Sequence, residues 1–229
     1  PSRHTIRSQR DGQPVYRHFV GWRDREKHIA MSGDETYWLY SASKLVTCVA
    51  ALTLYERGMF LMTDPVSAYL QGFDRLNVRH IRPDGTETIV PARHPMTIRS
   101  LFNMTSGLDY NLHTQDIETA IVNTKGRAPT VEMASVIARR PLLFEPGSHF
   151  AYGLSHDVLA AMVEVISGQR FGEYVRRILF EPCGMTRSGY HLTPELGACM
   201  AKQYRYREET RTAEPGTMSN EYVFGSEYE

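Results

Sequence analysis

The chain has 229 residues, of which 41% are hydrophobic and 23% charged, an ordinary composition for a globular protein and not that of a disordered one. Its 26 Lys and Arg balance 26 Asp and Glu, so the formal net charge is zero. Composition therefore indicates no basic face for a nucleic-acid partner. No stretch approaches the roughly 18 consecutive apolar residues of a membrane span.

The three cysteines and the first residues bear on the cellular compartment. Three cysteines leave at least one unpaired, and the apolar helical run around Cys48 predicts a small buried thiol there, so we expect no disulfide framework. The chain starts at Pro1 without an initiator Met or an apolar signal region, so its start looks trimmed. Localisation stays open between cytoplasm and periplasm.

Two strand-like stretches within residues 5–21 flank Asp11-Gly12, a strong signal for a tight antiparallel turn. Apolar residues at three- and four-residue spacing then predict a core helix of about 15 residues that starts near Ser41 and ends at Gly58. Asp64-Pro65 predicts an N-cap and a short helix. Further predictions are a hairpin around residues 78–90, helices from residue 97 and over 131–139, 157–167 and 171–179, and a polar connection over 22–34. The tail from residue 204 to residue 229 is polar and shows little periodicity.

Ser41-Ala42-Ser43-Lys44 is the only Ser-x-x-Lys sequence in the chain, and it lies where an aromatic, strand-like segment gives way to the apolar helix. Residues three apart share a helix face, so the Lys44 amine can reach the Ser41 hydroxyl. Such an amine accepts the Ser proton directly or through a neighbour, which activates a weak nucleophile. The alternative is structural: Ser41 caps the helix and Lys44 is a solvated first-turn residue.

Four segments together resemble the serine β-lactamase-related and penicillin-binding-protein family, in its order and at similar spacing over nearly the whole chain. They are Tyr40-Ser41-Ala42-Ser43-Lys44 and residues 61–70 (LMTDPVSAYL), 96–108 (MTIRSLFNMTSGL) and 180–185 (FEPCGM). The resemblance implies an α+β, β-lactamase/transpeptidase-like fold with a helical domain packed on an antiparallel sheet. It predicts one catalytic domain over 1–229, with strands at 5–21 and a helical part at about 41–190.

The same resemblance implies roles for individual residues. Ser41 is the nucleophile that forms the acyl-enzyme, and Lys44 is its activating amine. Tyr152, which follows a Pro-Gly turn, is the general base and acid, with a core aromatic residue as the alternative. Candidate substrate-binding residues are Tyr40, Trp38, Ser155 and His156.

Two departures from the family pattern shape the functional expectation. Leu154 stands where family members commonly have the Asn of Tyr-x-Asn, which favours the esterase-like branch. The late-strand Lys-Thr-Gly or His-x-Gly element, which supplies one backbone N–H of the oxyanion hole, does not occur in the chain. We therefore expect that the C-terminal part of the family domain is absent and that a missing segment or a second chain completes the fold.

The sequence predicts a serine hydrolase that acts on a small ester, lactam or peptide substrate. Esterase activity comes first, then β-lactamase, then D-Ala-D-Ala carboxypeptidase activity. We expect no cofactor and no metal, because the chain has no His-Glu-x-x-His pair, Cys-x-x-Cys or phosphate-binding Gly loop. The alternatives are a catalytically silent binding or scaffold module and an unstable fragment without a function of its own.

Overall fold

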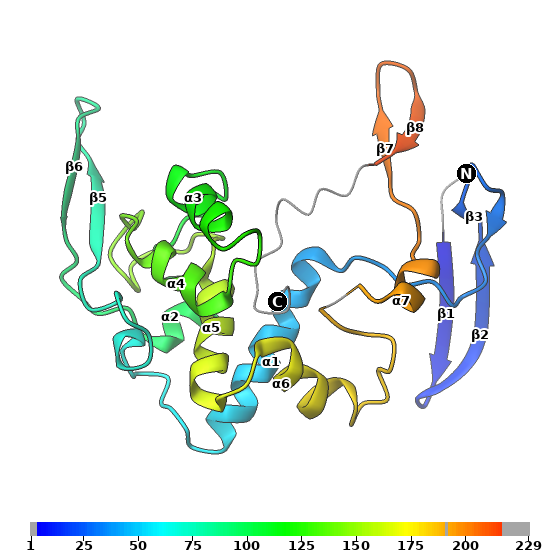
Figure 1. Cartoon of the computed structure of the whole chain (residues 1–229), viewed down its shortest axis with the longest axis horizontal. Helices are drawn as coiled ribbons and strands as arrows, with labels where there is room; N and C mark the ends of the chain where they lie inside the picture. Colours follow the sequence, from blue (N-terminus) through cyan, green and yellow to red (C-terminus); the bar gives the residue numbers. More distant parts are fainter. Residues whose placement is uncertain (1–3, 191, 217–229) are drawn as a thin grey trace. The chain divides into compact units, whose positions relative to one another are not determined.

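The structure, a computed structural model, describes residues 4–190 and 192–216 (Figure 1). These residues form two compact units. Within the described part of the chain, the first unit comprises residues 4–39 and 192–216, and the second comprises residues 40–190. The interpretation of residues 1–229 as one catalytic domain stays a prediction.

The first unit opens with the predicted antiparallel hairpin of β1 (His4–Arg10) and β2 (Gln13–Val20). Asp11 and Gly12 both have positive φ, 53° and 75°, as a primed two-residue turn requires. The strand register shifts between Ser8 and Gln9, which marks an irregularity in this ladder. The turn residues therefore explain why the chain reverses here.

Four short strands and one helix complete the first unit. The polar stretch after β2, predicted as a connection, contains the paired strands β3 (Trp22–Asp24) and β4 (Ile29–Ala30). Helix α7 (Pro194–Ala198) precedes the hairpin of β7 (Tyr204–Arg207) and β8 (Thr212–Pro215). The sequence analysis did not predict this hairpin, because it is largely exposed and polar and has no buried face that would leave a hydrophobic pattern. The rest of that tail, residues 217–229, lies outside the described residues.

Hydrogen bonds join the late part of the first unit to its early part. The Thr36 N–H donates to the Cys199 carbonyl at 3.0 Å. Nearby, Lys202 Nζ and the Tyr204 hydroxyl both donate to Glu26 at 2.7 Å. These two hydrogen bonds lower the pKa of Glu26 to about 2, so its carboxylate stays charged at neutral pH.

The second unit is mainly helical. Strands β5 (Asn77–Ile81) and β6 (Glu87–Pro91) form the predicted hairpin at one side of it. A 3₁₀ turn at Tyr40–Ala42 leads into the first helix. The helices are α1 (Ser43–Glu56), α2 (Ile98–Phe102), α3 (Gln115–Asn123), α4 (Thr130–Ala138), α5 (Ser155–Ser167) and α6 (Phe171–Val175), which continues as a π-helical turn at Arg176–Phe180.

Helix α5 forms the centre of the core of this unit and packs against α1, α2, α4 and α6. It buries Val158, Leu159, Met162 and Val163, whose four-residue spacing places them on one face of the helix. It ends at Gly168, which takes the left-handed conformation of a C-terminal cap. On α1 the small residues Ala50 and Ala51 are buried, which lets that helix approach its neighbours closely. This packing fixes α1 and α5 relative to each other.

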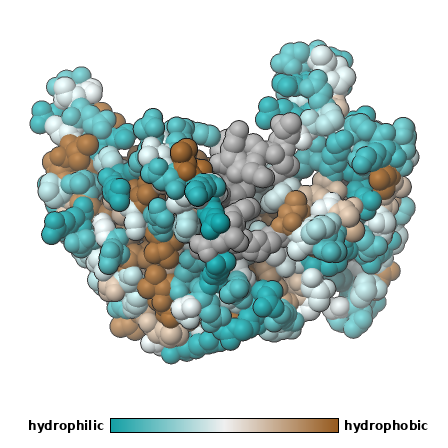
Figure 2. Space-filling view, viewed as in Figure 1, coloured by the Kyte–Doolittle hydropathy of each residue, from teal (hydrophilic) through white to brown (hydrophobic). Residues whose placement is uncertain are grey.

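On the face of the protein drawn in Figure 2, hydrophilic residues (teal) predominate, and hydrophobic residues (brown) lie among them. Leu45 and Leu61 on the second unit are among the large hydrophobic residues that are exposed.

The prediction that Asp64 caps a helix was wrong. Its carboxylate accepts hydrogen bonds from the Leu61 N–H and the Tyr69 hydroxyl, both at 2.8 Å, and so closes the preceding turn. The element that follows is only a 3₁₀ turn at Val66–Ala68. Asp before Pro therefore stabilises a loop here, not a helix N-terminus.

Candidate active site

Ser41 lies in the 3₁₀ turn that leads into α1 and is exposed to solvent. The residue before it, Tyr40, has a positive φ of 47°, an uncommon conformation for a non-glycine residue that stores local strain. The Ser43 hydroxyl donates to the Tyr40 carbonyl and closes this turn. The turn thereby places the Ser41 hydroxyl at the positive end of the α1 dipole, which favours a developing alkoxide.

Lys44 lies in the first turn of α1 and is half-buried. Its Nζ is 5.0 Å from the ring centroid of Tyr152 and 5.4 Å from that of Tyr110. Both distances are within the range of cation–π contacts. Two tyrosine rings therefore hold the Lys44 side chain beside the Ser41 turn.

Tyr152 comes from a distant part of the sequence, just before α5. Its hydroxyl donates a hydrogen bond to Ser41 Oγ at 2.7 Å. The structure thus brings together Ser41, Lys44 and Tyr152, the three residues predicted as catalytic. This hydrogen bond is the path along which a proton can pass between the two hydroxyl groups.

Main-chain hydrogen bonds hold Tyr152 against the loop after α2. The Ala151 N–H donates to the Met104 carbonyl at 3.1 Å, and the Leu154 N–H donates to the Asp109 carbonyl at 3.0 Å. Between them, Gly153 approaches the loop so closely that a Cβ there would lie 2.1 Å from the Leu108 carbonyl oxygen. Only glycine fits this approach without a shift of backbone.

The electrostatic surroundings of Tyr152 favour its ionised form. Burial by itself raises the pKa of the phenol, but hydrogen bonding with Ser41 and Lys44 and the charge of Lys44 outweigh it. Asp157 acts weakly in the opposite direction. The net pKa of Tyr152 therefore lies below its ordinary value of 10, which suits a general base.

The four predicted substrate-binding residues have different positions. Tyr40 is exposed, next to Ser41, whereas Trp38 belongs to the first unit and is half-buried. Ser155 is fully buried, and its hydroxyl pairs with that of Ser106 at 2.8 Å. That hydroxyl therefore has a partner inside the protein and does not lie on a surface that a substrate reaches.

His156 is also buried and contacts other parts of the helical unit. Its Nε2 lies 3.2 Å from the Phe102 carbonyl oxygen and 3.5 Å from Cys48 Sγ. Burial lowers the pKa of His156 and raises that of the Cys48 thiol, so both groups are neutral near pH 7. Cys48 is half-buried, and it is a free thiol, as are Cys183 and Cys199. The contact between Cys48 and His156 joins α1 to α5.

Two residues near Lys44 were missed by the sequence analysis. The Tyr110 ring lies edge-on to that of Tyr152, with centroids 5.2 Å apart. Asp157 lies in the first turn of α5, and the charge of Lys44 acts to lower its pKa. The only sequence signal for Tyr110 is its place two residues after Leu108, at the end of one of the motif segments.

Burial of the Asp157 carboxyl group leads us to expect that the free energy of unfolding depends on pH. Burial raises its pKa from 3.8 to about 6, although the charge of Lys44 lowers it. The folded state then holds this proton more tightly than the unfolded state, so stability falls as pH rises from about 4 to above 6. Asp157→Asn should be about 1–3 kcal/mol more stable than wild type at pH 7.5 and similar at pH 4. Urea unfolding at both pH values measures this, and equal stability at pH 7.5 would contradict it.

The chain matches the family described as Beta-lactamase over residues 8–226. The chain belongs to the β-lactamase family. It is 27% identical over 194 residues to protein Rv1367c of Mycobacterium tuberculosis, covering 84% of this chain and 48% of that protein. It is 32% identical over 191 residues to esterase EstB of Burkholderia gladioli, covering 79% and 45%. The chain thus spans about half the length of the curated relatives it matches.

A solved structure of this fold is similar over most of the chain. EstCE1, described as a hydrolase with promiscuous acyltransferase activity, matches with a TM-score of 0.71 and 27% identity, covering 94% of this chain and 56% of that one. Together with the helices and small antiparallel sheets, these matches confirm the predicted α+β, β-lactamase/transpeptidase-like fold class.

Metal ligands and membrane spans were also sought in the described part of the chain. Within residues 4–190 and 192–216, no three His, Cys, Asp or Glu side chains gather in a way that would hold a metal ion. Over the same ranges, no helix combines the length and apolar character needed to cross a bilayer.

Proposed function

We propose that the chain carries the nucleophile, amine and general base of a serine hydrolase that forms an acyl-enzyme on Ser41. The observation that carries this proposal is the 2.7 Å hydrogen bond between the Tyr152 hydroxyl and Ser41 Oγ. Lys44 beside the same ring supplies the positive charge that favours the Tyr152 phenolate. A nucleophile, a base in contact with it and a group that tunes the base are the parts such chemistry needs.

In the acylation step, the ionised Tyr152 accepts the proton of the Ser41 hydroxyl while Oγ attacks the substrate carbonyl carbon. The Ser41 backbone N–H and the α1 dipole face the oxyanion of the tetrahedral intermediate. Tyr152 then donates the proton to the leaving alcohol as its bond to the carbonyl carbon breaks. In deacylation, Tyr152 accepts a proton from water, water attacks the ester carbon, and the proton returns to Ser41 Oγ as the acid leaves.

Esters are the substrate class that we favour over lactams and peptides. Leu154 is 1% exposed, so the position two residues after Tyr152 presents no polar group to an amide-bearing substrate. Two of the matched proteins are named as an esterase and as a hydrolase with acyltransferase activity, which supports the same class. Carboxylesterase-like hydrolysis is therefore the first activity to test.

Intact-mass spectrometry after incubation with a fluorophosphonate, and separately with a penicillin, tests the nucleophile. We expect one fluorophosphonate adduct on the wild-type chain and none on Ser41→Ala. Ser148→Ala is the matched control, because Ser148 is also exposed in the second unit, and its hydroxyl contacts the Glu145 carbonyl and His149 Nδ1, not the proposed catalytic residues. It should label like wild type.

The penicillin arm separates substrate classes. A stable penicilloyl adduct on Ser41 would favour β-lactam recognition over ester hydrolysis. Absence of any adduct on a folded chain would contradict the serine-hydrolase proposal and favour a catalytically silent binding module.

A further inference from the structure

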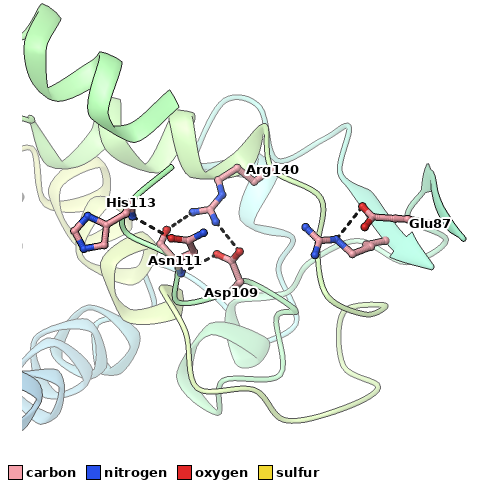
Figure 3. Close-up of polar contacts among 6 residues, drawn as sticks. Glu87, Asp109, Asn111, His113 and Arg140 are labelled. Atoms are coloured by element: carbon pink, nitrogen blue, oxygen red, sulfur yellow. Dashed lines mark hydrogen bonds and ion pairs between the residues drawn. The ribbon is translucent and has the colours of Figure 1, made fainter. Parts of the chain in front are cut away.

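An ion pair lies beside the loop that carries Tyr110 (Figure 3). Arg140, just after α4, contacts the Asp109 carboxylate at 2.5 Å through Nη2. Both side chains are mostly buried, with 13% of Arg140 and 22% of Asp109 exposed. Arg140 Nη1 also donates to the Asn111 carbonyl at 2.8 Å. One guanidinium therefore holds the loop at the residues on both sides of Tyr110.

The loop is further closed by its own polar side chains. The second carboxylate oxygen of Asp109 accepts from the Asn111 N–H at 3.3 Å, and the Asn111 side-chain oxygen accepts from the His113 N–H at 3.1 Å. Figure 3 shows these contacts in sequence along the loop. Both carboxylate oxygens of Asp109 thus have hydrogen-bond partners. Since the carboxylate is mostly buried, the loss of Arg140 would leave it without its counter-charge.

The held loop reaches the candidate active site in two ways. The Tyr110 ring packs edge-on against Tyr152 and lies 5.4 Å from Lys44 Nζ. The main-chain carbonyl of Asp109 accepts the Leu154 N–H, two residues after Tyr152. The Asp109 side chain, held by Arg140, thus fixes the position of Tyr110 beside Lys44, whereas the Asp109 main-chain carbonyl is a separate contact to the backbone next to Tyr152.

We propose that the Asp109–Arg140 ion pair is a positioning device that sets Tyr110 against Lys44 and Tyr152. This inference rests on the function proposed above for the same site. Tyr110 touches the catalytic side chains, and Asp109 and Arg140 act through it. Without the ion pair the Tyr110 ring leaves its place, and the Lys44 amine loses one of its two aromatic neighbours.

The position of Lys44 is measured directly by NMR of the chain after ¹³C-dimethylation of its lysines. The sequence has only Lys27, Lys44, Lys125 and Lys202, and Lys44→Arg assigns the Lys44 signal. In the wild type the neighbouring rings should shift this signal away from the position of a solvated lysine. We expect Arg140→Met and Tyr110→Leu to move it toward that position and to leave the other three signals unchanged.

Fluorophosphonate labelling of Ser41 gives the functional readout. Arg140→Met should slow labelling about ten- to a hundredfold, since a small misplacement of catalytic groups has effects of this size. In the Tyr110→Leu background the same substitution should have little further effect, because both changes remove one interaction. Arg140→Lys keeps the positive charge but cannot contact both Asp109 and the Asn111 carbonyl as the two guanidinium nitrogens do. It should therefore label faster than Arg140→Met but more slowly than wild type.

Glu87→Gln is the matched control. Glu87 pairs with Arg79 at 3.2 Å on the β5–β6 hairpin, also drawn in Figure 3, and should change neither readout. Where Arg140→Met does not fold, Asp109→Asn carries the same test with an unchanged side-chain volume.

Two results would overturn the inference: a wild-type Lys44 signal in the folded Arg140→Met chain, or an undiminished effect of Arg140→Met in the Tyr110→Leu background. Failure of the wild-type chain to label overturns the proposed function instead, and the Lys44 signal then decides the positioning role alone.

Discussion

Tyr152→Phe should lower the acylation rate of Ser41 by about 10²- to 10⁴-fold, the usual contribution of a general base. The substitution keeps the ring that contacts Tyr110 and Lys44 and removes only the hydroxyl that bonds to Ser41 Oγ. Packing is therefore retained, and thermal stability should change little. The burst of nitrophenol from a p-nitrophenyl ester, or the fluorophosphonate labelling rate, measures the effect.

The pH dependence of the same reaction identifies Tyr152 as the titrating group. A base acts only in its deprotonated form, so the acylation rate should rise with pH up to the pKa of Tyr152 and then level off. That pKa lies below 10, since Ser41 and Lys44 together outweigh the effect of burial. Tyr152→Phe should lack this limb of the profile.

Tyr69→Phe is the control for Tyr152→Phe. The Tyr69 hydroxyl donates to Asp64, and burial together with this carboxylate raises its pKa. Its loss should leave both the rate and the pH profile as in wild type. A Tyr152→Phe chain that acylates at the wild-type rate would assign the base to Lys44 alone.

The sequence predicted those parts of the site that follow from local geometry. The three-residue spacing of Ser41 and Lys44 on one helix face is a property of the helix itself. Tyr152 is 111 residues from Ser41, and no periodicity connects the two, so its place followed only from family resemblance. The regular apolar spacing of α1 and α5 likewise predicted both helices.

What the sequence did not predict depends on tertiary contacts. Tyr110 lies in an irregular loop whose shape comes from Asp109, Arg140 and the approach of Gly153, and no local pattern encodes these partners. Helix α3 was missed because its buried residues, Ile117 and Ala120, pack on a small separate cluster with α4. Ser155 was predicted to contact substrate, but its hydroxyl pairs with that of buried Ser106, a tertiary contact that no local pattern indicates.

The close contact at Gly153 predicts the second large effect. An Ala Cβ there would meet the carbonyl oxygens of Leu108 and Asp109 at 2.1 and 2.8 Å, and backbone atoms cannot move away as a flexible side chain can. Gly153→Ala should therefore destabilise the second unit by about 1–3 kcal/mol. It should also slow Ser41 labelling roughly 100-fold per folded molecule, because Tyr152 is displaced with the backbone.

Urea unfolding of Gly153→Ala is best followed by far-UV circular dichroism, because both Trp residues, Trp22 and Trp38, lie in the first unit. Gly197→Ala is the control: its Cβ would meet only the Leu192 side chain at 3.8 Å, an ordinary contact. Alanine suits a helix better than glycine by up to about 1 kcal/mol, so Gly197→Ala in α7 should be neutral or stabilising and should label normally. Wild-type stability and labelling in Gly153→Ala would mean that the loop after α2 yields, and that the backbone contact at Gly153 does not fix the position of Tyr152.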